Sequence, residues 1–114
     1  ILKYRLGDKY TFSVPLLTPE AEDLLKRLPE DYEGEVYLVA RKIDVLIDAG
    51  NSYIIVELKE RGRPSGIGQL LDYKRLFIKT YKPQKTIRLA YAVAYMDKDV
   101  EELCHDYGIE TYII

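Results

Sequence analysis

The chain of 114 residues has little cysteine and no long apolar run. Its single cysteine, Cys104, has no partner for a disulfide within the chain, which excludes a disulfide-stapled scaffold. Because disulfides are rare in reducing compartments, this usage favours a cytoplasmic protein. No apolar stretch approaches the roughly 18 residues that a membrane-spanning helix needs, so we expect no association with a membrane.

Side chains that degrade on heating are also scarce. The sequence contains one Met, one Asn and two Gln, whereas 32% of its residues are charged. This balance is typical of thermophilic proteins, and we expect a thermophilic source. A chain of 114 residues without repeats or a Pro/Gly/Ser-rich linker predicts a single domain over residues 1–114.

The net charge is only −2, but the charges are segregated along the chain. Residues 59–88 carry nine basic and two acidic side chains, whereas the segments on either side are acidic. A concentrated positive segment of this kind could follow a phosphate backbone. The alternative is a solvated helix face joined to a basic loop.

Local patterns predict alternating strands and helices. Thr18, followed by Pro19 and acids, is typical of a helix start, and Pro29 ends the helix predicted over residues 19–28. The other predicted elements are strands at 36–40, 42–48 and 53–59, a helix at 65–81, a strand at 86–95, a helix at 97–107 and a strand at 109–114. This α-β-β-β-α-β-α-β order predicts an α/β protein with a central mixed sheet flanked by helices.

Two acids are predicted to face each other in a hairpin over residues 42–59. If the hairpin closes symmetrically on the turn at 49–52, Asp44 lies directly opposite Glu57. Opposed residues have Cβ atoms about 4.5–5.5 Å apart, so two ionised carboxylates there repel each other unless a cation lies between them. Mg²⁺ commonly binds one or two carboxylates and retains waters, which suits phosphodiester hydrolysis.

Lys59 follows Glu57 on the same strand face, about 6.6 Å further along. Its ammonium could stabilise charge on an attacked phosphate or hold the attacking water. Leu58 points to the opposite face, but its main-chain carbonyl is a candidate third metal ligand. Each part alone has a plainer explanation, namely solvated charges for the E-x-K pattern and a surface acid for Asp44.

Together these residues resemble the PD-(D/E)XK nuclease superfamily, which includes many restriction enzymes, archaeal Holliday-junction resolvases and archaeal mismatch-cleaving endonucleases. The resemblance covers residues 41–95 and implies a restriction-endonuclease-like core. Asp44 matches the first acid of the family motif, and Glu57-Leu58-Lys59 matches its (D/E)XK element. Ile43 stands where the family name has Pro, a position at which relatives often lack Pro.

A second motif and a third acid follow from the same resemblance. Gly68 to Tyr73, on the helix after the third strand, resembles the Gln-and-Tyr helix motif of the resolvase and mismatch-endonuclease branches. In those relatives the Gln lies near the catalytic residues, which implies that role for Gln69. Relatives commonly have an upstream acid on the first helix, and among Glu20, Glu22 and Asp23 we favour Glu22.

The resemblance implies hydrolysis of DNA that depends on Mg²⁺ or Mn²⁺, without an organic cofactor. Asp44 and Glu57 would hold the metal, Lys59 would assist the water and phosphate, and Gln69 would orient the site. The expected DNA contacts are Arg61, Arg63, Tyr73, Lys74, Arg75 and Lys79. A small nuclease that cuts two antiparallel strands often works as a two-fold dimer, so we expect a homodimer.

Two other functions remain open. A nucleic-acid-binding module could keep the fold and the basic segment but have lost cleavage. The chain could also be an interaction domain of a larger protein, which the missing N-terminal Met allows. Metal-dependent cleavage of DNA separates the nuclease from both alternatives.

Overall fold

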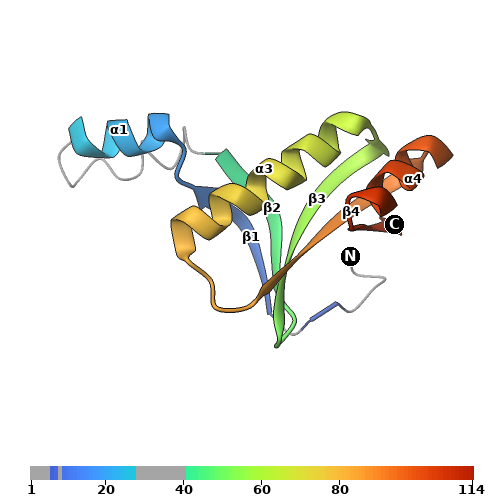
Figure 1. Ribbon diagram of the computed structural model, residues 1–114, viewed down its shortest axis with the longest axis horizontal. Coiled ribbons are helices and arrows are strands. Elements are labelled where there is room, and N and C mark those ends of the chain that lie inside the picture. The colour runs from blue at the N-terminus through green and yellow to red at the C-terminus, as the bar shows by residue number, and fades with distance from the viewer. Residues whose placement is uncertain (1–5, 8, 28–40) are drawn as a thin grey trace.

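The computed structural model describes residues 6–7, 9–27 and 41–114 (Figure 1). The helices and strands in these ranges are β1 (Lys9–Leu16), α1 (Pro19–Arg27), β2 (Arg41–Asp48), β3 (Ser52–Gly62), α3 (Pro64–Tyr81), β4 (Thr86–Met96), α4 (Lys98–Asp106) and β5 (Ile109–Ile113).

The five strands form one mixed sheet in the order β1-β2-β3-β4-β5. The pairs β1–β2 and β2–β3 are antiparallel, whereas β3–β4 and β4–β5 are parallel. Parallel neighbours need a crossover connection, and here α3 and α4 provide the two crossovers. Both helices lie over the same face of the sheet (Figure 1).

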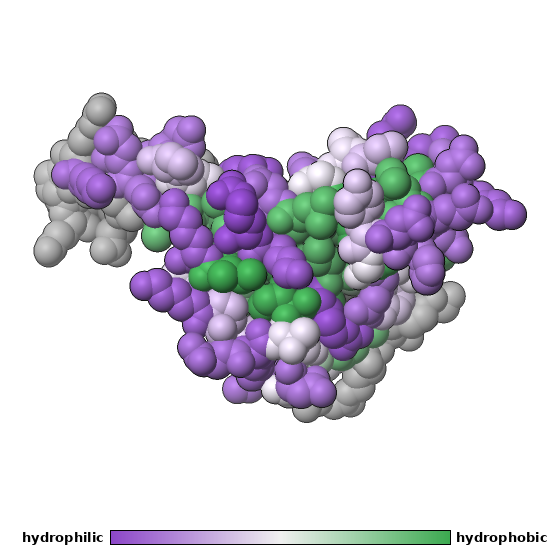
Figure 2. Space-filling model, viewed as in Figure 1, coloured by the Kyte–Doolittle hydropathy of each residue, from purple (hydrophilic) through white to green (hydrophobic). Residues whose placement is uncertain are grey.

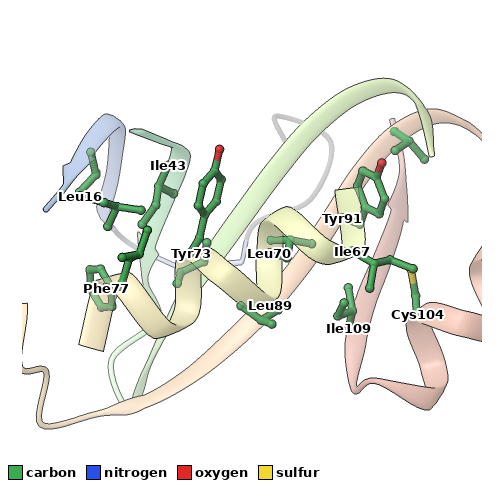
Figure 3. Packing of buried hydrophobic residues seen from close by; sticks show 14 of the residues in the cluster. Leu16, Ile43, Ile67, Leu70, Tyr73, Phe77, Leu89, Tyr91, Cys104 and Ile109 are labelled. Atoms are coloured by element: carbon green, nitrogen blue, oxygen red, sulfur yellow. The ribbon is translucent and has the colours of Figure 1, made fainter. Parts of the chain in front are cut away.

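The main hydrophobic core lies between this face and the two helices (Figure 3). Residues three, four or seven apart on α3, such as Ile67, Leu70 and Phe77, point into it together, as a helical period requires. The apolar side chains of Leu71 and Ile78, also on α3, are 38% and 46% exposed. A smaller cluster buries the opposite face of the sheet through Val45, Ile47, Ile54, Val56, Ala90 and Ala92.

The predicted order of elements needs one correction. β1 was not expected, although its residues alternate as in a strand, because Pro15 argues against one. Within β1, Ser13 has a positive φ of 53°. The strand predicted at residues 36–40 lies outside the described residues. Within the described ranges the order is therefore β-α-β-β-α-β-α-β. The mixed sheet is confirmed, but the helices that pack on it, α3 and α4, lie over one face of it.

The sheet forks between β2 and β3. Their pairing runs from Asp48–Tyr53 to Val45–Val56, and no further pair forms between them in the part of the chain that is described. Beyond that point β2 continues beside β1 as far as Arg41, whereas β3 continues beside β4 as far as Gly62. The two arms of the sheet therefore separate where Asp44 and Glu57 stand.

The surface combines charged and apolar regions. Figure 2 shows hydrophilic side chains over α1 and the outer end of α4, with apolar side chains between them on the face viewed. Phe12 on β1, an edge strand of the sheet, is 66% exposed. Among the described helices, none combines the length and the apolar character that crossing a membrane requires.

Candidate active site at the fork of the sheet

The hairpin register expected from the sequence is confirmed. The observed pairs, such as Val45 with Val56, follow the register that sets Asp44 against Glu57. The neighbouring Asp44 carboxyl raises the pKa of Glu57. Asp44 also accepts a hydrogen bond of 3.0 Å at Oδ2 from the main-chain N–H of Leu58. The fork thus holds two acids in contact, as the sequence predicts.

Glu57 is an unusual residue for a protein interior. Its side chain is 2% exposed, and its Oε2 atom has no hydrogen-bond partner among the described residues. Burial, the hydrogen bond with Asp44 and the charge of Asp44 raise the pKa of Glu57 to about 8, while the charges of Lys59 and Arg41 lower it. A buried acid of this kind destabilises a fold and is therefore typical of a functional site.

Lys59 and Gln69 lie together in a cavity that neither Asp44 nor Glu57 lines. The cavity has a volume of about 430 Å³ and lies at the junction of β3 and α3. Its other lining residues are Glu60, Arg61, Arg63, Ser65 and Tyr91. Lys59 comes from the part of β3 that extends beyond its pairing with β2, and Gln69 comes from the second turn of α3. The structure therefore brings the E-x-K lysine and the helix glutamine into one concave surface, and the charge of Lys59 acts on Glu57.

Tyr91 of β4 holds the main chain at Arg63, one of the basic residues of this cavity. Its hydroxyl accepts a hydrogen bond of 3.0 Å from the Arg63 N–H and donates one of 3.1 Å to the Arg63 carbonyl. A Cβ atom at Gly66 would lie 2.0 Å from the Tyr91 hydroxyl oxygen, so this close approach needs glycine. The sequence pattern identifies Tyr91 only as part of an apolar strand, so this loop contact was missed.

Tyr73 lies on the same face of α3 as Gln69, four residues on. Its ring packs in the core while its hydroxyl points away from the packed residues (Figure 3). Burial, followed by the charge of Glu57, raises the pKa of the Tyr73 hydroxyl. The guanidinium of Arg41 lies 5.1 Å from the centre of the Tyr73 ring. Arg41 therefore belongs to the site, although no motif in the sequence points to it.

The basic segment at 59–88 separates into paired and unpaired cations. Four of its nine basic residues form ion pairs with acids: Arg75 with Asp72, Lys79 with Glu22, Lys85 with Asp48 and Arg88 with Glu110. Among the described residues, Lys59, Arg61, Arg63, Lys74 and Lys82 form no ion pair. The net positive charge is therefore more local than the sequence suggests, and three of the unpaired cations line the cavity.

Glu22 lies with Lys79 rather than with the paired acids. Its Oε1 atom is 3.5 Å from the Lys79 ammonium, towards the C-terminal end of α3. In the described residues no contact joins Glu22 to Asp44 or Glu57. A catalytic role for Glu22 stays a prediction from the resemblance.

The donor atoms at the fork are suited to a hard divalent cation. Asp44 and Glu57 supply carboxylate oxygens, and Glu57 Oε2 has no other partner among the described residues. The described part of the chain has no cluster of three or more His, Cys, Asp or Glu side chains. Mg²⁺ commonly binds through one or two carboxylates and keeps several waters, so two acids are sufficient.

Comparison with known proteins bears on the fold. No protein-family model matches the sequence, and no curated protein matches it. A repair endonuclease from Pyrococcus abyssi has a similar structure, with a TM-score of 0.54 and 18% sequence identity over 65% of this chain. The matched region covers 33% of that endonuclease. Over the matched region the chain therefore shares the fold of part of that endonuclease.

Proposed function

We propose that this chain is a metal-dependent nuclease domain of the PD-(D/E)XK type that cuts DNA as an endonuclease. One observation carries the proposal: Glu57 is 2% exposed, contacts Asp44 and has an oxygen without a partner among the described residues. A core residue with that burial would ordinarily be apolar, because an unpaired buried carboxylate is costly. The similarity of the fold to a repair endonuclease supports the same function.

Asp44 and Glu57 would hold Mg²⁺ or Mn²⁺, and the main-chain carbonyl of Leu58 is the candidate third ligand. When bound, such a cation supplies a positive charge between the acids and lowers the pKa of a coordinated water. The hydrogen bond from the Leu58 N–H fixes one oxygen of Asp44, so the acid is oriented before any ligand arrives.

Lys59 and Gln69 would act on the substrate side of the acids. The Lys59 ammonium can donate hydrogen bonds to a non-bridging phosphate oxygen and offset the charge that develops during attack. Gln69 lines the same cavity and offers both a donor and an acceptor, which suits it to orienting a water or a phosphate oxygen. The half-buried position of Gln69 limits its freedom of movement.

DNA would enter along the unpaired cations of the cavity. Arg61 and Arg63 are exposed and form no ion pair within the described ranges, so their donors are available to backbone phosphates. Tyr91 holds the main chain of Arg63 on both its N–H and its carbonyl, which reduces the ordering that binding requires. A homodimer would present two such sites to the two strands of a duplex.

The direct test is cleavage of linear, mismatched and branched DNA with Mg²⁺, with Mn²⁺ and with EDTA. We expect cleavage with either metal and none in EDTA. Glu57→Gln, purified in parallel, controls for a contaminating nuclease because it keeps the shape of the side chain and removes its charge. DNA binding without cleavage of any substrate would favour a binding module with the same fold and would exclude the proposed activity.

A further inference from the structure

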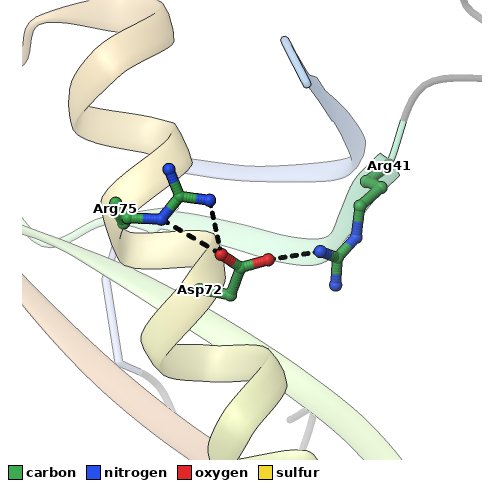
Figure 4. A network of polar contacts seen from close by, with 3 residues as sticks. All are labelled: Arg41, Asp72 and Arg75. Atoms are coloured by element: carbon green, nitrogen blue, oxygen red, sulfur yellow. Dashed lines mark hydrogen bonds and ion pairs between the residues drawn. The ribbon is translucent and has the colours of Figure 1, made fainter. Parts of the chain in front are cut away.

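Two arginines meet a single carboxylate at the edge of the fork. Asp72 of α3 accepts a hydrogen bond from Nη1 of Arg41, the first residue of β2 (Figure 4). Its other oxygen accepts hydrogen bonds of 3.2 and 2.8 Å from Nε and Nη2 of Arg75. The three side chains together carry a net charge of about +1, since one anion faces two guanidinium groups that are always protonated.

Stability alone gives a weak explanation of this arrangement. The side chains of Arg41, Asp72 and Arg75 are 41%, 29% and 65% exposed, and exposed ion pairs typically contribute about 0–1 kcal/mol. A second arginine on the same acid also repels the first. The arrangement instead fixes the directions of two guanidinium groups, and the Tyr73 ring 5.1 Å from Arg41 fixes one of them further.

The cluster stands beside the paired acids, on the other arm of the fork from Lys59. Arg41 is three residues before Asp44 on β2, whereas Lys59 continues along β3. The charge of Arg41 lowers the pKa of Glu57, so the guanidinium is within electrostatic reach of that carboxyl group. Cations therefore flank the acids on both arms, which is the arrangement that a strand lying across the fork would need.

We propose that Arg41 and Arg75, held in place by Asp72, form a clamp for one backbone phosphate of DNA next to the site of cleavage. Each guanidinium has five N–H donors, of which Asp72 takes one from Arg41 and two from Arg75. The remaining donors can bind phosphate oxygens in the planar geometry that arginine favours. Because Asp72 orders both side chains in advance, less freedom is lost when the phosphate binds. The clamp rests on the proposed function, since it takes DNA as the ligand.

Salt-dependent binding of a fluorescently labelled DNA duplex in EDTA tests the clamp without cleavage. Arg41→Ala and Arg75→Ala should each lower the slope of log K against log salt concentration by about 1 and weaken binding about tenfold. Arg41→Lys should keep most of the slope but bind more weakly than the wild type. An ammonium keeps the charge but lacks the planar set of donors that can hold Asp72 and a phosphate at the same time. Lys82→Ala is the matched control, an exposed cation beyond the C-terminal end of α3 that forms no ion pair in the described part of the chain.

The change in DNA affinity on Asp72→Asn distinguishes a phosphate clamp from a structural bridge, that is, a set of ion pairs that only supports the fold. The clamp predicts unchanged or tighter DNA binding, because neutralising an acid beside the phosphate outweighs the loss of one of its two acceptor oxygens. A bridge predicts that Asp72→Asn and Arg41→Ala weaken binding alike, and that result would overturn the clamp. Binding is compared at a temperature where melting curves show every variant folded.

The clamp and the nuclease can fail separately. If the wild type cuts DNA but its DNA binding does not depend on Arg41, the clamp is contradicted and the nuclease proposal stands. If the wild type binds DNA through Arg41 and Arg75 but does not cut it, the nuclease proposal is contradicted and the clamp stands. A wild type that does not bind DNA loses both.

Discussion

The main-chain N–H of Leu58 donates a hydrogen bond of 3.0 Å to Oδ2 of Asp44. This bond lies just past Val45–Val56, where the pairing of β2 with β3 ends. The carboxylate thereby takes the place of a main-chain acceptor on the neighbouring strand. The same side chain also contacts Glu57, so Asp44 joins the two arms of the sheet and orients one acid of the pair.

Replacements of Asp44 should lower the free energy of unfolding by different amounts, depending on whether the new side chain keeps a hydrogen-bond acceptor. At pH 6 in EDTA we expect Asp44→Ala to lower the free energy of unfolding by about 1–3 kcal/mol, because the Leu58 N–H and Glu57 both lose a partner. Asp44→Asn keeps an oxygen at the same place and should cost less than about 1 kcal/mol. Urea unfolding measures both variants. Equal stability of Asp44→Ala and the wild type would show that the Leu58 bond contributes nothing.

The stability of the metal-free protein should fall as pH rises from about 5 to about 8. The folded pKa of Glu57, about 8, lies above its ordinary value of 4.5, so the folded state binds a proton more tightly than the unfolded state. The stability present below pH 4.5 is therefore lost as pH rises through 8. In EDTA, thermal melting of Glu57→Gln should show a smaller fall over this range, by on the order of 5 °C. Parallel curves for both proteins would contradict the raised pKa.

Two glycines on the first turns of α3 should respond oppositely to alanine. Gly66→Ala places a Cβ atom 2.0 Å from the Tyr91 hydroxyl oxygen, so the helix or the tyrosine must move. We expect a loss of about 1–3 kcal/mol in the free energy of unfolding. Gly68 has open space at its Cβ position and is the matched control, for which alanine should add about 0.5–1 kcal/mol. Denaturant unfolding that gave both variants the same sign would contradict the close packing of Tyr91.

Cations within the basic segment should contribute unequally to DNA binding. Arg63→Ala should lower the slope of log K against log salt concentration by about 1, because its charge is not offset by an acid. Lys79→Ala should change the slope by less than about half as much, since Glu22 lies 3.5 Å from its ammonium. Equal effects of the two substitutions in a binding titration would show that the ion pair with Glu22 does not persist in solution.

The hairpin register was predictable because the alternation of Ile43, Val45 and Ile47 and the compact turn at 49–52 leave one register that buries the apolar residues. That register alone sets Asp44 against Glu57. The helix over 64–81 was predictable from its apolar period for the same kind of reason, namely that the information is local.

Other features depend on contacts that are distant in the sequence. The contact of Arg41 with Asp72 spans 31 residues, and that of Tyr91 with Arg63 spans 28, so no local period indicates either. The strand β1 was missed although its apolar residues alternate with Lys9, Thr11, Ser13 and Pro15. Pro15 argues against a strand, and the pairing partner β2 begins 25 residues after Leu16. The fork itself follows from where two strand pairings end, which is a tertiary property.

The central claim is that the protein cleaves DNA with the help of a divalent metal ion held by Asp44 and Glu57. Its most direct test measures DNA cleavage with Mg²⁺ by the wild type, Asp44→Asn and Glu57→Gln, beside thermal melting of each protein with and without Mg²⁺. We expect each variant to lose at least about 100-fold in cleavage rate, and Mg²⁺ to raise the melting temperature of the wild type alone. Glu57→Gln should melt at or above the wild-type temperature in EDTA at pH 8, because it removes the buried charge. Cleavage by both variants at the wild-type rate would contradict the claim.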